Sequence, residues 1–167
     1  HLSLNNDGYI IGIEKRERIM TSKERIIVSH HEAGHALTAY ILKESTQPVK
    51  VSIIPRGESA LGFSMQKPID KKLYSKNELI AKICVLLGGR ISEEIMFNEI
   101  TTGSSDDIEK ISNIAESMIK IYGMNSNLDP ISYSNNEKKL SNNINDSIYI
   151  EINKIINKCK KITKNIL

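Results

Sequence analysis

Hydrophobic residues recur at helical spacing along much of the chain, and the clearest stretch begins after Thr21. Apolar residues there follow one another at gaps of three, four and seven, which is the spacing of one helix face. Thr21 and Glu24 have the spacing of a capping box, in which each side chain accepts a hydrogen bond from the other residue's backbone N–H. This stretch therefore predicts a helix over residues 22–43.

Three further segments have helical periodicity. Ser75 and Glu78 form a second capping-box pair, and the apolar run after them predicts a helix that meets Gly88 and Gly89. The glycine pair favours close helix packing over contact with a ligand. The last segment has a stripe of isoleucines. The helices predicted after the first cover residues 79–87 and 90–97, 106–122, and 147–165.

A strand is predicted between the first two helices. Val49, Val51 and Ile53 alternate with Lys50 and Ser52, which is the period of a half-buried strand. Residues 61–65 predict a second short strand. The first strand is either an ordinary member of a sheet or an edge that pairs with an extended peptide substrate. The pattern as a whole predicts an α+β fold that is mainly α-helical.

The remaining segments are polar. Residues 1–20 hold a short apolar patch among polar and charged residues and are interpreted as a connector. Residues 125–146 are rich in Asn and Ser, so we expect a mobile loop over 134–146, preceded by a brief strand at 131–133. The domain proper is thus predicted to span residues 21–167.

Composition narrows the class of protein. A chain of 167 residues with 40% hydrophobic residues can bury the core of one domain. The net charge of +3 is carried by residues 146–167, which contain five lysines and two acidic residues. That excess, without interleaved aromatic residues, does not favour nucleic-acid binding. Two cysteines are too few for a disulfide framework, and no apolar run reaches the 18 residues of a membrane span.

The string His31-Glu32-Ala33-Gly34-His35 has the pattern HExxH. Residues at i and i+4 lie one above the other on a helix, so both imidazoles can reach one ion. Glu32 can then point at a metal-activated water and accept its proton as the water attacks a carbonyl carbon. The alternative is a pair of histidines on a half-buried helix with no metal.

A catalytic zinc ion needs a third protein ligand. His30 points about 100° away from His31 around the helix, so it cannot easily share the ion. No HxxGxxH extension follows His35. A carboxylate from a distant segment is favoured, and spacing alone leaves four candidates open: Asp106, Asp107, Glu93 and Glu94.

Further segments add to this motif: HEAGHAL (31–37), VSIIPRG (51–57) with ALGF (60–63), LLGGRISEEIMF (86–97), EITTGSSDDIEK (99–110), and YGMN (122–125) with LDPISY (128–133). In this order and spacing they resemble the peptidase domain of FtsH-type membrane-anchored, ATP-dependent zinc metalloproteases. The resemblance covers roughly residues 10–133. It implies a zincin-like HExxH helix with a small sheet and a helical bundle.

The resemblance also implies roles for single residues. Zinc would be bound by His31, His35 and Asp107, and Glu32 would be the catalytic base. Asp106 stands where the family usually has Asn, so it adds a negative charge beside the ligand. Glu93 resembles a carboxylate that the family keeps near its zinc site.

The family's activity and assembly are implied as well. We expect a zinc metalloendopeptidase that hydrolyses unfolded or damaged polypeptides as a homohexamer. An AAA ATPase module in cis and a membrane anchor would lie outside this chain, since no GxxxxGK[ST] motif occurs in it. The parent protein would be anchored in a bacterial inner membrane, a mitochondrion or a plastid. The alternative is a non-catalytic module that only holds the hexamer, and the intact Glu32 argues against it.

Overall fold

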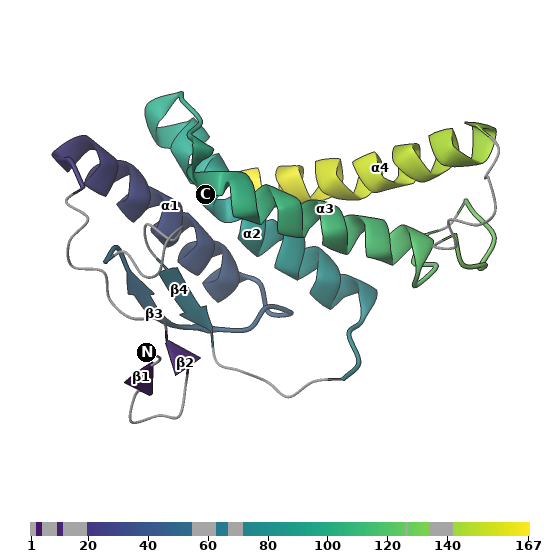
Figure 1. Cartoon of the computed structure of the whole chain (residues 1–167), viewed down its shortest axis with the longest axis horizontal. Helices are drawn as coiled ribbons and strands as arrows, with labels where there is room; N and C mark the ends of the chain where they lie inside the picture. Colours follow the sequence, from purple (N-terminus) through teal and green to yellow (C-terminus); the bar gives the residue numbers. More distant parts are fainter. Residues whose placement is uncertain are drawn as a thin grey trace.

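The computed structural model describes residues 3–4, 10–11, 20–54, 63–66, 72–125, 127–133 and 142–167. Four long helices account for most of these residues, with a small two-stranded sheet beside the first of them (Figure 1). This confirms the mainly helical fold that the sequence predicts. Most of the predicted connector over residues 1–20, and residues 134–141 of the loop predicted over 134–146, lie outside the described residues.

Helix α1 spans Ser22–Ile41 and begins as its capping signal predicts. The Thr21 hydroxyl accepts a hydrogen bond from the Glu24 backbone N–H at 3.2 Å, and the Glu24 carboxylate accepts one from the Thr21 N–H at 2.7 Å. Helix α2, Lys76–Phe97, starts with the same reciprocal pair between Ser75 and Glu78. Both helix starts are therefore fixed by local hydrogen bonds that the sequence reveals.

Strands β3 (Pro48–Ser52) and β4 (Phe63–Gln66) form an antiparallel pair with a register shift between Pro48 and Lys50. They match the two strands predicted from the alternation, and β3 contacts α1. A second short pair, β1 (Ser3–Leu4) with β2 (Ile10–Ile11), lies near the N-terminus. Within the described residues each sheet thus has only two strands.

The remaining helices are η1 (Thr102–Ser104, a 3₁₀ turn), α3 (Ser105–Lys120) and α4 (Asn142–Ile166). Helix α4 lies along α2 and α3 (Figure 1). Their buried side chains form the main core. Its fully or nearly fully buried members include Ile83, Cys84, Ile91, Ile111, Ala115, Met118 and Cys159. Both cysteines are free and buried.

The structure differs from the predicted elements in three places. Helix α2 runs without a break through Gly88 and Gly89. Helix α4 starts at Asn142, five residues before its predicted start; the added residues are exposed, and the Ser147 hydroxyl donates to the Asn143 carbonyl oxygen in this turn. Residues 131–133 form no strand, since the Tyr133 N–H donates to the Lys120 carbonyl oxygen at the end of α3. Among the described helices, none has both the length and the apolar character needed to cross a bilayer.

Candidate metal centre

The candidate site is built where α1 crosses α2, and two glycines let the helix backbones touch. A Cβ atom on Gly88 would lie 2.5 Å from the Gly34 carbonyl oxygen, and a Cβ on Gly34 would clash with the Gly88 carbonyl oxygen. No side chain larger than hydrogen fits between the helices at this point. The predicted preference of the glycine pair for close packing is thus explained for Gly88. The crossing places the HExxH turn of α1 directly against α2.

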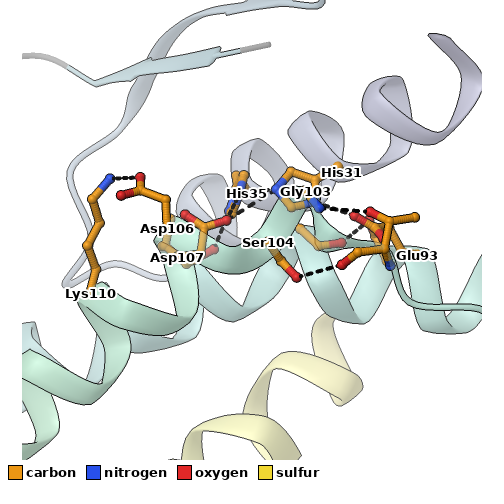
Figure 2. Close-up of polar contacts among 12 residues, drawn as sticks. His31, His35, Glu93, Gly103, Ser104, Asp106, Asp107 and Lys110 are labelled. Atoms are coloured by element: carbon orange, nitrogen blue, oxygen red, sulfur yellow. Dashed lines mark hydrogen bonds and ion pairs between the residues drawn. The ribbon is translucent and has the colours of Figure 1, made fainter. Parts of the chain in front are cut away.

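Three side-chain atoms from α1 and α3 converge at this crossing. The Nε2 atoms of His31 and His35 are 3.0 Å apart, and Asp107 Oδ2 lies 3.2 Å from the first and 3.1 Å from the second. Figure 2 shows Asp107 turned toward the two rings. Both histidines are buried, and the Asp107 side chain is 15% exposed. Residues 76 positions apart in the sequence therefore meet around one point.

The hydrogen-bond partners behind each ring determine which nitrogen carries the hydrogen. His35 Nδ1 lies 2.7 Å from the Val85 carbonyl oxygen, which can only accept, so Nδ1 donates. His31 Nδ1 lies 2.6 Å from Glu93 Oε1 and donates to that carboxylate. In the neutral imidazoles both Nε2 atoms are then left with lone pairs. The two lone pairs and the Asp107 carboxylate oxygen form a cluster of potential metal-donor atoms, called the donor cluster below, in which the neutral rings place no N–H group.

Such a cluster suits a divalent cation. Tetrahedral zinc with bonds of about 2.0–2.1 Å places its ligands about 3.3 Å apart, close to the 3.0–3.2 Å separations here. Among the His, Cys, Asp and Glu residues that the structure describes, these three form the group whose ligand atoms lie close enough together to hold one metal ion. Two imidazoles and one carboxylate are a typical catalytic zinc set, which leaves a coordination position for water or substrate. The residues present therefore fit zinc.

The turn before α3 places Asp107. Thr101 caps η1 through a hydrogen bond from the Gly103 N–H, and α3 follows with Asp106 and Asp107 in its first turn. The Glu93 carboxylate bridges this turn to the site, because Oε2 accepts from the Thr101 N–H at 2.9 Å while Oε1 accepts from His31. Glu93 is 1% exposed. One buried carboxylate thus connects α1, α2 and the turn that carries the third donor.

Charges within the cluster shift its pKa values in opposite directions. Burial lowers the pKa of His31, but hydrogen bonds to Asp107 and Glu93, with their charges, outweigh it and raise the pKa to about 9. Burial raises the pKa of Asp107, and the hydrogen bonds and charges of His31 and His35 outweigh it and hold that pKa well below its usual range. A positive charge, carried by a proton or by a metal cation, therefore stabilises this cluster.

Glu32 lies beside this cluster and is buried, with 7% of its surface exposed. Burial raises its pKa, and the charges of His35 and His31 act against that shift. The charge of Asp107 raises it further, so the Glu32 carboxylate lies within electrostatic range of His31, His35 and Asp107.

Other residues considered from the sequence lie elsewhere. Asp106 is 71% exposed at its side chain and pairs with Lys110 at 2.5 Å, pointing away from the histidines (Figure 2). Asp106 therefore precedes Asp107 in the chain but turns to the surface, because consecutive helix positions point about 100° apart. Glu94 pairs with Lys164, and His30 packs its ring edge-on against Phe97. Neither joins the donor cluster.

The predicted substrate strand β3 is largely exposed. Val49 is 62% exposed and Val51 42%, whereas Ile53, just beyond the strand, is half-buried. Val49 sits at the register shift of the pair. The strand is therefore a surface feature beside α1.

The resemblance indicated Glu93, but the sequence missed the rest of the contribution of α2. Val85, Gly89 and Glu93 follow at spacings of four, so they lie on one face of that helix. Val85 acts through its carbonyl oxygen and Gly89 through the absence of a side chain, so neither residue type suggested a role. The i, i+4, i+8 spacing around the glycine pair was the available signal.

Comparison with known proteins decides the family. The family model described as peptidase family M41 matches residues 18–167. The chain belongs to peptidase family M41. This confirms the resemblance to FtsH-type proteases drawn from the motifs, and with it the prediction of a peptidase domain.

Several curated relatives of this M41 domain are named ATP-dependent zinc metalloprotease FtsH. The ATP-dependent zinc metalloprotease FtsH of Chlorobium luteolum is 48% identical over 130 residues, which is 76% of this chain and 18% of that protein. FtsH of Clostridium perfringens is 50% identical over 121 residues, 72% of this chain and 17% of that protein. FtsH 2 of Bdellovibrio bacteriovorus is 49% identical over 116 residues, 69% of this chain and 19% of that protein. The chain thus spans about a fifth of the length of these relatives.

Proposed function

We propose that this M41 domain hydrolyses peptide bonds of unfolded polypeptides at a zinc ion held by His31, His35 and Asp107. The observation that carries the proposal is the convergence of His31 Nε2, His35 Nε2 and Asp107 Oδ2 within 3.0–3.2 Å of one another, while both Nδ1 atoms are hydrogen-bonded elsewhere. When bound, zinc would act as a Lewis acid and lower the pKa of a coordinated water toward about 7.

The chain's own groups then move the protons. Glu32 accepts a proton from the attacking water as the water oxygen bonds to the carbonyl carbon of the substrate. The C–N bond breaks, and Glu32 passes that proton to the departing amine nitrogen. The buried position of Glu32 beside the ligands supports this role. A structural metal site would have no need of such a base.

Glu93 and Val85 act through the histidines. Each accepts the Nδ1–H of one ring and so orients its Nε2 toward the shared point. Partners of this kind fix the tautomer and raise the basicity of a metal-bound imidazole. We propose Glu93 as a positioning residue in this sense, and we assign Asp106 no role at the metal.

The substrate class follows from the surface beside the site. β3 is paired on one side only within the described residues, and it exposes Val49 and Val51. An extended peptide could add to its free edge through backbone hydrogen bonds, which read no particular sequence. We propose that Val49, Val51 and Ile53 line this contact and that cleavage has broad specificity.

The larger assembly is proposed from the relatives. Their names describe ATP-dependent proteases, and residues 21–167 would be the peptidase domain, joined by residues 1–20 to an AAA ATPase module in cis. We propose a homohexamer whose ATPase modules deliver unfolded chains. The membrane would be contacted only by segments outside this chain, in a bacterial inner membrane or an organelle of bacterial descent, and nucleic acid would not be a partner.

Casein cleavage by the wild-type chain and by Glu32→Gln tests the catalytic proposal. Removal of a general base is expected to lower turnover by about 10²–10⁴-fold while the zinc content stays at one ion per chain. Equal turnover in both proteins would refute the role of Glu32. An absence of cleavage by a zinc-loaded wild type, with hexamers intact, would favour the non-catalytic module.

The ligand set has its own test in two neighbouring carboxylates. Asp107→Ala is expected to abolish stoichiometric zinc binding, whereas Asp106→Ala keeps it, because Asp106 pairs with Lys110 at the surface. Zinc analysis of purified protein after dialysis measures both. Loss of zinc in the Asp106 variant alone would overturn the third ligand.

A further inference from the structure

Gly89 lies against the very atoms that are proposed to hold zinc. A Cβ atom at this position would lie 2.5 Å from His31 Nε2 and 2.6 Å from His35 Nε2. Its neighbour Gly88 meets instead the Gly34 carbonyl and the Thr38 hydroxyl, which belong to the helix crossing. The two adjacent glycines thus face different things, and only Gly89 touches the donor cluster.

The rings have no easy way to retreat from such a Cβ. Carbon and nitrogen atoms normally approach to about 3.5–4.0 Å, so each ring would have to move by more than half an ångström. His31 is held from behind by Glu93 at 2.6 Å and His35 by the Val85 carbonyl at 2.7 Å. Both anchors belong to α2, the helix that carries Gly89. A side chain at 89 would therefore push the rings while the same helix holds them.

Metal coordination is sensitive to displacements of this size. Ligand distances in a working site fall within about 0.2 Å of their ideal values. We infer that Gly89 is a positioning residue of the metal centre, whose missing side chain keeps both Nε2 atoms in register with Asp107. This inference rests on the proposed zinc site. Val85, Gly89 and Glu93 lie on one face of α2 and together fix the positions of the two histidine rings of the HExxH motif.

Zinc affinity of Gly89→Ala against Ile95→Ala tests the inference. Ile95 lies on the same helix and is 48% exposed, so its substitution controls for a change on α2 outside the donor cluster. We expect wild type and Ile95→Ala to bind one zinc with equal affinity, and Gly89→Ala to bind about 10–100-fold more weakly. An affinity of Gly89→Ala within threefold of wild type would overturn the inference. A wild type that binds no zinc would instead overturn the proposed function.

A second measurement needs no metal and separates the ring contact from general helix damage. Thermal unfolding of metal-free protein is compared for Gly89→Ala in the wild-type background and in a His31→Ala, His35→Ala background. If the rings are what a Cβ strikes, the substitution lowers Tm in the first background and leaves it equal or higher in the second, since alanine favours a helix. The same loss of Tm in both backgrounds would overturn the contact.

Discussion

Helix α2 has two working faces, and they are built differently. The face toward α1 carries Gly88, Gly89, Ser92 and Glu93, so it consists of glycines and buried polar groups. The face toward α3 and α4 carries Ile83, Cys84, Leu87 and Ile91 in an apolar cluster. The face toward α1 makes specific hydrogen bonds and close backbone contacts. The face toward α3 and α4 buries apolar side chains.

The difference shows how one helix can serve both stability and a site. Burial of apolar side chains stabilises in proportion to area and tolerates changes that keep volume and pattern. Hydrogen-bonded buried groups such as Ser92, which contacts the His30 and Gly89 carbonyl oxygens at 2.6 and 2.9 Å, tolerate little displacement. The apolar face should therefore govern the free energy of unfolding, and the polar face the metal.

Truncation of Ile83 is the largest expected effect on stability. Ile83 is fully buried among α2, α3 and α4, so Ile83→Ala should lower the free energy of unfolding by about 2–5 kcal/mol. Urea unfolding of metal-free protein measures this, with Ile95→Ala as the control because Ile95 is on the same helix and 48% exposed. The folded fraction should keep its zinc affinity. A variant that loses zinc in proportion to stability would break the division between the faces.

Gly88→Ala should cost stability on the polar face through backbone crowding. Its Cβ would meet the Gly34 carbonyl oxygen at 2.5 Å, and a backbone atom cannot turn aside as a side chain can. The helices must separate, at about 1–3 kcal/mol, against a gain of up to about 1 kcal/mol from helix propensity. Thermal unfolding without metal measures the balance. An unchanged or raised Tm would mean that the backbones are not in contact.

Glu93→Gln sharpens the comparison by removing the charge while nearly keeping the shape. The amide oxygen can still accept from His31, but the NH2 group then faces the Thr101 N–H. The negative charge behind the ring and one acceptor are lost, so zinc should bind about 10–100-fold more weakly. That is about 1.4–2.7 kcal/mol of binding free energy. Competition with a chelating dye measures it. Glu94→Gln is the matched control, since Glu94 pairs with Lys164 and should leave the affinity unchanged.

Local signals made part of this architecture predictable. The capping boxes at Thr21 and Ser75 gave both helix starts, and the i, i+4 histidines gave the metal face of α1. Asp107 followed only from resemblance, because spacing along the chain does not say which distant carboxylate meets the histidines. The start of α4 was missed because residues 142–146 are exposed and polar apart from Ile144, so they show no apolar periodicity. The role of the Val85 carbonyl could not be predicted, because every residue type carries the same backbone acceptor.

Glu151 gives the smallest expected effect and tests a polar group on the apolar side. It lies on α4, 9% exposed, and accepts from Lys154 at 2.7 Å and Asn127 at 2.8 Å. Hydrogen bonds to Lys154 and then Asn127 lower the pKa of Glu151 from 4.5. Since Lys154 is largely exposed, water screens the pair, and we expect no more than about 1 kcal/mol.

The sign of its pH dependence follows from the lowered pKa. Because the folded state holds the Glu151 proton more weakly than the unfolded state, its stabilisation is present above pH 4.5 and is lost as the pH falls below that value. The Tm of wild type should therefore exceed that of Glu151→Gln at pH 7, and the gap should close as the pH falls below 4.5. A gap that stays constant or widens in acid would show that Glu151 acts through shape instead of charge. It would then belong with the apolar face in how it stabilises the fold.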